Sequence, residues 1–149
     1  MRYLLDTNIL LFYVRDNQTR QFIEDNYAPF SQKEDPVISI VSVAEILALA
    51  GDNNWGERKL KLVQKLIDRL VIVEIRYDEL VRNYVHIERY NRSNHPTKKR
   101  TGSHIKMSKN DIWIAATAML TKSILLTSDK DFEHLDKEFI DVMVIEPQP

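Results

Sequence analysis

The chain has 149 residues, of which 44% are hydrophobic and 29% charged, the size and composition of a single globular domain. Its formal net charge of −1 argues against nucleic-acid binding by overall charge alone, and the lack of cysteine excludes disulfides, thiolate metal sites and a cysteine nucleophile. The three glycines stand singly, so neither a P-loop nor a dinucleotide-binding glycine motif can be written.

The chain also lacks membrane and export signals. No apolar run approaches the length needed to cross a membrane. The first residues, MRYLLDTN, place an acid after a very short apolar stretch, which is not the pattern of a secretory signal. We therefore expect a cytoplasmic protein that has no membrane partner.

Short apolar segments alternate with helical patterns along the chain. We expect strands at 3–5, 37–40, 71–73, 124–126 and 142–144. Apolar spacing and capping residues predict helices at 9–14, 19–27, 42–51, 58–70, 80–87, 108–120 and 129–135. Gly51 is the expected end of the helix that Ser42 begins. This alternation predicts one α/β domain over residues 1–149, with a parallel sheet covered by helices on both faces.

Acidic residues follow the predicted strands or begin the helices after them. Asp6 follows the first strand and Glu45 the second, Asp111 begins an apolar helix, and Asp129 follows the fourth strand with Asp131 beside it. In a parallel sheet these positions share one edge, where carboxylates without a cationic partner repel one another unless a cation binds. Taken singly, Glu45, Asp111 and Asp131 are also explained as capping residues, because Ser42, Ser108 and Ser128 precede them at capping-box spacing. Asp6 is harder to explain in this way, because an acid that ends an apolar strand is desolvated unless a positive charge lies beside it.

Basic residues gather before Asp111. Seven lysines and arginines and no acid lie between residues 89 and 110, in a segment that we expect to be a loop over 91–106. A docking role for RNA phosphates is one interpretation, and a solvated loop is the other. The residues that would carry docking are Lys98, Lys99, Arg100, Lys106 and Lys109. A basic amphipathic helix at 58–70 is a second cationic surface.

Four segments, in order, resemble the motifs of PIN-domain ribonucleases: LLDTN at 4–8, VAEI at 43–46, NDIWIAATA at 110–118 and LLTSDKDF at 125–132. At this length the chain resembles the VapC-type toxins of prokaryotic toxin–antitoxin pairs. The resemblance implies a three-layer fold whose five-stranded parallel sheet has the order 3-2-1-4-5.

The resemblance also implies a site and partners. Asp6, Glu45, Asp111 and Asp129 would be the catalytic, metal-binding acids, with Asn8, Thr127 and Asp131 as supporting residues. One or two Mg²⁺ or Mn²⁺ ions would bind there, and an all-oxygen ligand set suits these hard cations. The implied activity is endonucleolytic cleavage of RNA, with transfer RNA as one substrate class. A cognate antitoxin and a homodimer are the implied protein partners.

Other α/β proteins with acids at strand ends fit less well. A phosphoacceptor receiver domain has two adjacent acids after its first strand and a lysine after its last, and this chain has neither. A haloacid-dehalogenase-type phosphatase has an acid where Asn8 stands. The alternative that remains is a non-catalytic RNA- or protein-binding module whose acids are only helix caps.

Overall fold

The computed structural model describes residues 1–76 and 78–149. Its elements, in chain order, are β1 (Tyr3–Leu5), α1 (Thr7–Arg15), α2 (Asn17–Asn26), the 3-10 turn η1 (Pro29–Ser31), β2 (Val37–Ser39), α3 (Ile40–Asp52), α4 (Glu57–Asp68), β3 (Val71–Val73), α5 (Asp78–Asn91), α6 (Lys109–Thr121), β4 (Ile124–Thr127), the 3-10 segment η2 (Lys130–Leu135) and β5 (Asp141–Val144). Within the described residues, no helix is long and apolar enough to cross a bilayer.

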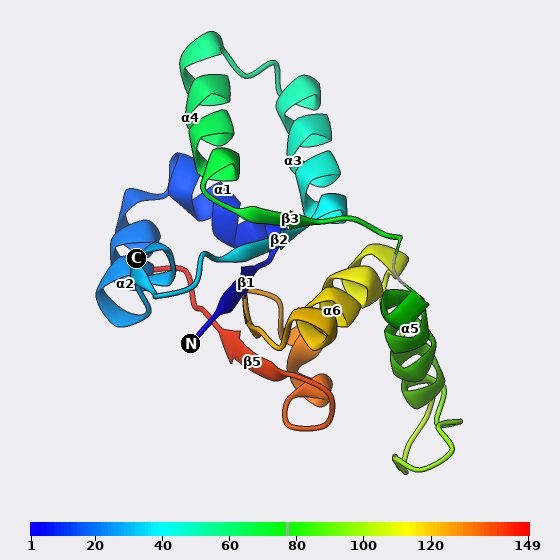
Figure 1. The fold of residues 1–149 in the computed structure, drawn as a ribbon. Helices are drawn as coiled ribbons and strands as arrows, with labels where there is room; N and C mark the ends of the chain where they lie inside the picture. The colour runs from blue at the N-terminus through cyan, green and yellow to red at the C-terminus, as the bar shows by residue number, and fades with distance from the viewer. Residues whose placement is uncertain (77) are drawn as a thin grey trace.

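The strands form one parallel sheet in the order β3-β2-β1-β4-β5, which confirms the predicted topology. β1 is central, between β2 and β4 (Figure 1). Because all strands run the same way, the segments that leave β1, β2 and β4 start from a single edge of the sheet.

Helices cover both faces of this sheet, since successive strand residues point to opposite sides. Leu4, Val37 and Leu125 belong to a core shared with α5, α6 and η2. Leu5, Ile38 and Leu126 belong to a second core shared with α1, α2, α3 and α4. The sheet and its two helical layers therefore form the expected three-layer α/β domain.

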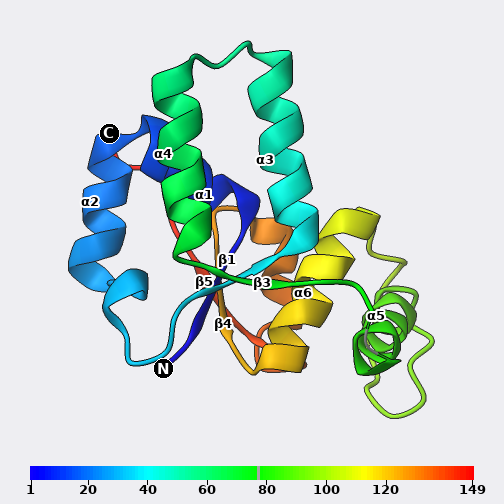
Figure 2. The ribbon, with the colours of Figure 1, turned by 45° about the horizontal axis from the view of Figure 1, so that its top comes forward.

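Coverage is incomplete at the β3 edge, contrary to the sequence expectation. Val71 and Ile72 are 38% and 41% exposed. β3 has a neighbour on one side only, and α3 and α4 project away from the sheet as a pair rather than lying over this strand (Figure 2). An apolar strand sequence alone does not reveal which strand will be at the edge.

The start and end of α3 also differ from the prediction. The helix begins at Ile40, because the Ser39 hydroxyl accepts a hydrogen bond from Val41 N directly after β2. Ser42 is therefore a buried residue inside the helix and not its cap. At the other end, Gly51 is still helical, and Asn54 adopts the left-handed conformation with φ 50°. Asparagine tolerates this conformation better than most residues, so the glycine is not needed there.

Candidate functional site

The Asp6 carboxylate is buried at the carboxyl end of the central strand. Its side chain is 5% exposed and begins α1, with Oδ1 accepting a hydrogen bond from Thr7 N at 2.8 Å. Oδ2 accepts the Thr127 hydroxyl at 2.7 Å, and the same Thr127 Oγ1 accepts Asp129 N at 3.0 Å. Thr127, the last residue of β4, thus joins Asp6 after β1 to Asp129 after β4, although Asp6 and Thr127 are 121 positions apart in the chain.

A second hydrogen bond connects this point to α3. The Thr7 hydroxyl donates to Glu45 Oε1 at 2.8 Å. Thr7 was not among the residues predicted for the site, although it stands inside the LLDTN motif. Its contribution depends on α3 passing close to α1, which the local sequence does not reveal.

The remaining predicted residues lie around these two hydrogen bonds. Asp111 is half-buried in the first turn of α6, where the Ser108 hydroxyl accepts its backbone N–H and caps the helix as predicted. Asp129 is half-buried after β4, and its Oδ1 accepts Asp131 N at 2.8 Å. Asn8 and Asp131 are exposed.

The capping explanation holds for three of the four acids. Asp6 and Asp129 each accept a hydrogen bond from a backbone amide at the start of a helical segment. Asp111 lies in the first turn of α6, three residues after the cap Ser108, as the predicted capping box requires. Glu45 instead accepts the Thr7 hydroxyl of another helix, so capping does not explain why Glu45 lies near Asp6.

The acids act on one another electrostatically. Burial raises the pKa of the Asp6 carboxyl to about 6, against its hydrogen bonds from Thr127 and Thr7, and the charges of Asp111 and Glu45 raise it further. Burial also raises the pKa of Asp111 to about 6, with added repulsion from Asp129, Glu45 and Asp131. Within residues 1–76 and 78–149, neither Asp6 nor Asp111 forms an ion pair with a lysine or arginine.

Such a cluster fits a divalent cation in its chemistry and charge. Every predicted ligand offers a hard carboxylate oxygen, and the mutual repulsion is of the kind that a bound cation relieves. In the described part of the chain, however, no three acidic or histidine side chains are placed to hold one ion as they stand. Ion binding would therefore require a rearrangement of these side chains.

The basic segment after α5 is an ordered loop. His95 is buried, and its Nδ1 accepts backbone N–H groups from Thr97 and Lys98 at 3.2 and 2.9 Å. Nδ1 must therefore be unprotonated, so Nε2 carries the proton and donates to His86 Nδ1 at 2.9 Å. A neutral His95 holds the loop against α5.

Arg100 is the second anchor of this loop. Its guanidinium donates to the carbonyl oxygens of Tyr90, Asn91 and Ser103 at 2.7 to 3.0 Å. Lys98 pairs with Glu138 at 3.7 Å. These two predicted RNA contacts are thus already engaged within the protein, whereas Lys99, Lys106 and Lys109 are exposed.

Comparison with known proteins places the chain among others of its fold. The PIN domain family model matches residues 3–138. VapBC2 from Rickettsia felis, solved with a promoter DNA fragment, contains a chain with TM-score 0.75 and 18% identity, covering 98% of this chain and 100% of that chain. VapBC-1 from nontypeable Haemophilus influenzae gives 0.73 and 20%, covering 97% and 98%, and FitAcB from Neisseria gonorrhoeae gives 0.65 and 22%, covering 97% of each chain. No curated protein matches the sequence.

Replacing Asp6 with asparagine should stabilise the protein in the absence of metal. A pKa raised from 3.8 to about 6 corresponds to about 3 kcal/mol of destabilisation when the carboxylate is charged. The amide cannot accept the Thr127 hydroxyl equally well, which offsets about 1 kcal/mol. Urea unfolding in EDTA at neutral pH should therefore show a gain of about 2 kcal/mol for Asp6→Asn.

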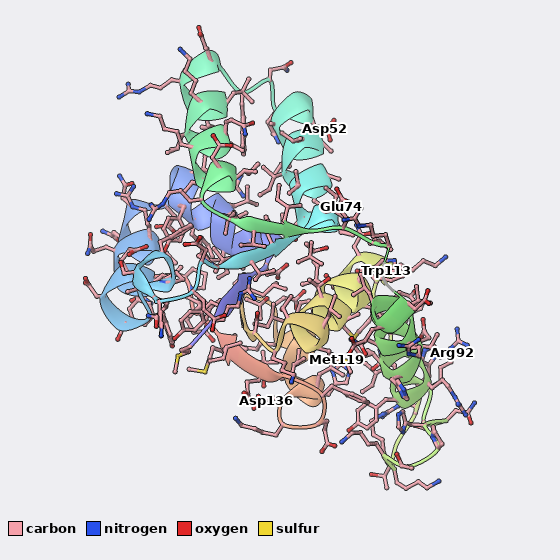
Figure 3. All side chains as sticks on the ribbon, viewed as in Figure 1. Asp52, Glu74, Arg92, Trp113, Met119 and Asp136 are labelled. Carbon is pink, nitrogen blue, oxygen red and sulfur yellow. The ribbon has the colours of Figure 1, made fainter. Side chains whose placement is uncertain are left out.

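The sign of the pH dependence follows from the raised pKa. The folded protein binds the proton more tightly than the unfolded chain, so the Asp6 penalty is complete above about pH 6 and absent below about pH 4. The advantage of Asp6→Asn should shrink across that interval. The exposed Asp52, on the outer part of α3 in Figure 3, supplies the control Asp52→Asn. Equal effects of the two substitutions would contradict the penalty assigned to Asp6.

The loop should loosen in mild acid because His95 must stay neutral. Burial lowers the pKa of His95, and the charges of His86, Arg89, Lys98 and Lys99 lower it further. A group with a depressed pKa stabilises the fold above its unfolded value of about 6.5 and loses that contribution as the pH falls. Protection of the Thr97 and Lys98 amides from hydrogen exchange, corrected for intrinsic rates, should fall in this range.

The exposed His104 provides the matched control for this prediction. His104→Gln should keep the acid-dependent loss of protection. His95→Gln should show low protection at every pH. If His95→Gln instead keeps the wild-type profile, His95 does not anchor the loop.

Proposed function

The chain belongs to the PIN domain family, and from this premise we propose that it is a divalent-metal-dependent endoribonuclease, the toxin of a toxin–antitoxin pair. The observation that carries the proposal is that Asp6, Glu45 and Asp111 repel one another at the carboxyl edge of the sheet, and that none of them forms an ion pair within the described residues. Capping alone does not require such a cluster, and a cation-dependent hydrolase does.

In this proposal Asp6, Glu45, Asp111 and Asp129 hold one or two Mg²⁺ or Mn²⁺ ions. When bound, such ions activate water, neutralise charge on the phosphate and stabilise the leaving oxygen. Thr127 orients Asp6 through its hydroxyl, and Asn8 and Asp131 are the further polar groups at the same edge. Cleavage on this pattern leaves a 5′-phosphate and a 3′-hydroxyl.

The basic loop supplies the first RNA contact in the proposal. It leads into α6 and hence to Asp111, so Lys99, Lys106 and Lys109 would hold the phosphate backbone near the acids. Lys98 and Arg100 would contribute after exchanging their present partners. Transfer RNA is the substrate class to test first.

Protein partners are proposed from the structural neighbours. The solved proteins of this fold include a toxin–antitoxin complex from Klebsiella pneumoniae and the DNA-bound VapBC of Salmonella typhimurium. By analogy, this chain would bind a small antitoxin that blocks the acidic edge, and would form a homodimer.

The second candidate is a non-catalytic RNA- or protein-binding module. It is favoured by the amide hydrogen bonds of Asp6 and Asp129, which are those expected of helix caps. This function requires no metal, and it predicts that Glu45→Gln and Asp111→Asn leave function unchanged.

Cleavage of a transfer RNA transcript in Mg²⁺ or Mn²⁺ tests the two candidates directly. We expect cleavage that EDTA abolishes and that Asp6→Asn or Asp111→Asn lowers by at least about 100-fold, because each removes a charged ligand. Asp52→Asn, which removes an exposed acid far from the cluster, should cleave at the wild-type rate. Cleavage that survives EDTA or Asp6→Asn would contradict the proposal.

In a parallel measurement, Mn²⁺ should raise the unfolding temperature of the wild type more than that of Asp6→Asn.

The loop contact has a separate test that needs no catalysis. Lys99→Gln, Lys106→Gln and Lys109→Gln together should weaken binding of the transcript in EDTA. The slope of log affinity against log salt should become shallower by about 2, as expected for three lost phosphate contacts. An unchanged slope would remove the loop from the RNA surface.

A further inference from the structure

A groove lies between α1 and the first three turns of α4, away from the acidic cluster. It has a volume of about 730 Å³ and is lined by Val14 of α1 and by six residues of α4 and its cap: Gly56, Arg58, Lys59, Lys61, Leu62 and Lys65. Four of the seven lining residues are therefore cationic. The groove is an open concavity whose lining comes mainly from α4, with Val14 contributed by α1.

The positive charge of this groove is poorly neutralised. Lys61 pairs with Glu57 at 3.1 Å, but both side chains are largely exposed and such pairs contribute little. Within the described residues, Arg58 and Lys65 form no ion pair. The other acid of α4, Asp68, accepts a hydrogen bond from Gln64 instead.

One lysine of the groove is held in place by an aromatic ring. The Lys59 ammonium lies over the half-buried Trp55 ring, 5.1 Å from its centroid. Trp55 packs against the core that α1 and α4 share, so it fixes Lys59 beside the groove. The floor is apolar, with Leu62 36% exposed and Val14 half-buried.

We propose that this groove binds the phosphate backbone of the RNA substrate, as a second docking surface in addition to the loop after α5. The proposal rests on the proposed nuclease function. Arg58 and Lys65 are seven residues apart on a helix, a span of about 10 Å, so the four cations contact a short run of phosphates and not a single ion.

The lining residues favour RNA over a protein segment. Lysine is depleted at the centres of protein–protein interfaces, which are enriched in aromatic anchors and arginine. Lysine and arginine together supply the usual contacts to nucleic-acid phosphates, and these contacts carry no sequence preference.

The placement of the groove indicates the size of the substrate. Figures 1 and 2 both put α4 and the loop after α5 at opposite ends of the molecule, with the sheet between them. An RNA that contacts both cationic surfaces must therefore extend across the whole domain. The substrate is accordingly a folded RNA or a long strand, and a short oligomer at the acidic edge cannot reach the groove.

The test compares Lys59→Gln/Lys61→Gln/Lys65→Gln with the charge-matched control Lys33→Gln/Lys122→Gln/Lys137→Gln, whose lysines are exposed elsewhere. Binding of an end-labelled transfer RNA transcript to the full chain is measured in EDTA over a salt series. The groove variant should bind about tenfold more weakly near physiological salt, with a slope shallower by about 2. The control variant should bind like the wild type.

Equal loss of affinity in both triple variants would overturn the proposal, because only net charge would then matter. Unchanged RNA affinity in the groove variant would also overturn the proposal. Selective loss of binding to a polyglutamate peptide would overturn it as well, and would assign the groove to an acidic protein segment. In Mg²⁺, cleavage of the transcript should slow in the groove variant while cleavage of a short RNA oligomer stays unchanged. Absence of any cleavage by the wild type contradicts the nuclease function, and the EDTA binding result still decides the role of the groove.

Discussion

The Asp6 carboxylate stands at the end of the central strand with only 5% of its surface exposed, and the rest of the site is organised around that charge. Burial of a carboxylate is unfavourable unless hydrogen bonds or a cation stabilise its charged form. Thr7 N and the Thr127 hydroxyl provide the hydrogen bonds, and Thr127 also binds Asp129 N, so the same contacts hold the ends of β1 and β4 in register. These hydrogen bonds stabilise the charge only in part, because burial still raises the pKa of Asp6 to about 6.

The destabilisation that remains at the buried acids connects the stability of the fold with the proposed binding of a cation. Asp6 and Asp111 both favour the protonated form more than an exposed aspartate does, and each is repelled by Glu45. A protein selected only for stability would place an amide or an apolar side chain at such positions. A divalent cation would remove the penalty and stabilise the folded state in proportion to its affinity. If the proposed cation binds, the cluster would be more stable loaded than empty, which is the behaviour expected of a binding site and not of a set of caps.

The sequence was sufficient to predict the strands, the α/β class and, through the family motifs, the sheet order, whereas the metal-binding role of the four acids stays a prediction. Local patterns misplaced the start of α3, because Ser39 and Ser42 are both plausible caps and only the end of β2 decides between them. The Thr7–Glu45 bond and the exposed face of β3 depend on how distant elements pack, so no local pattern contains them. The roles of His95 and Arg100 were missed for the same reason, since both residues bind main-chain groups of a loop without regular structure.

The distribution of charge resolves an apparent conflict between a net charge of −1 and the polyanionic substrate that we propose. An acidic cluster repels RNA until cations bind, so the attraction must come from surfaces elsewhere on the domain. Basic residues are concentrated in the loop after α5 and on α4, at opposite ends of the molecule (Figure 1). Two separated contacts restrict the orientation of a long RNA, whereas one contact next to the acids would bind any short strand equally well. A near-neutral domain whose positive charge is concentrated on α4 and in the loop after α5 therefore favours selective docking of an extended substrate over indiscriminate binding of nucleic acid.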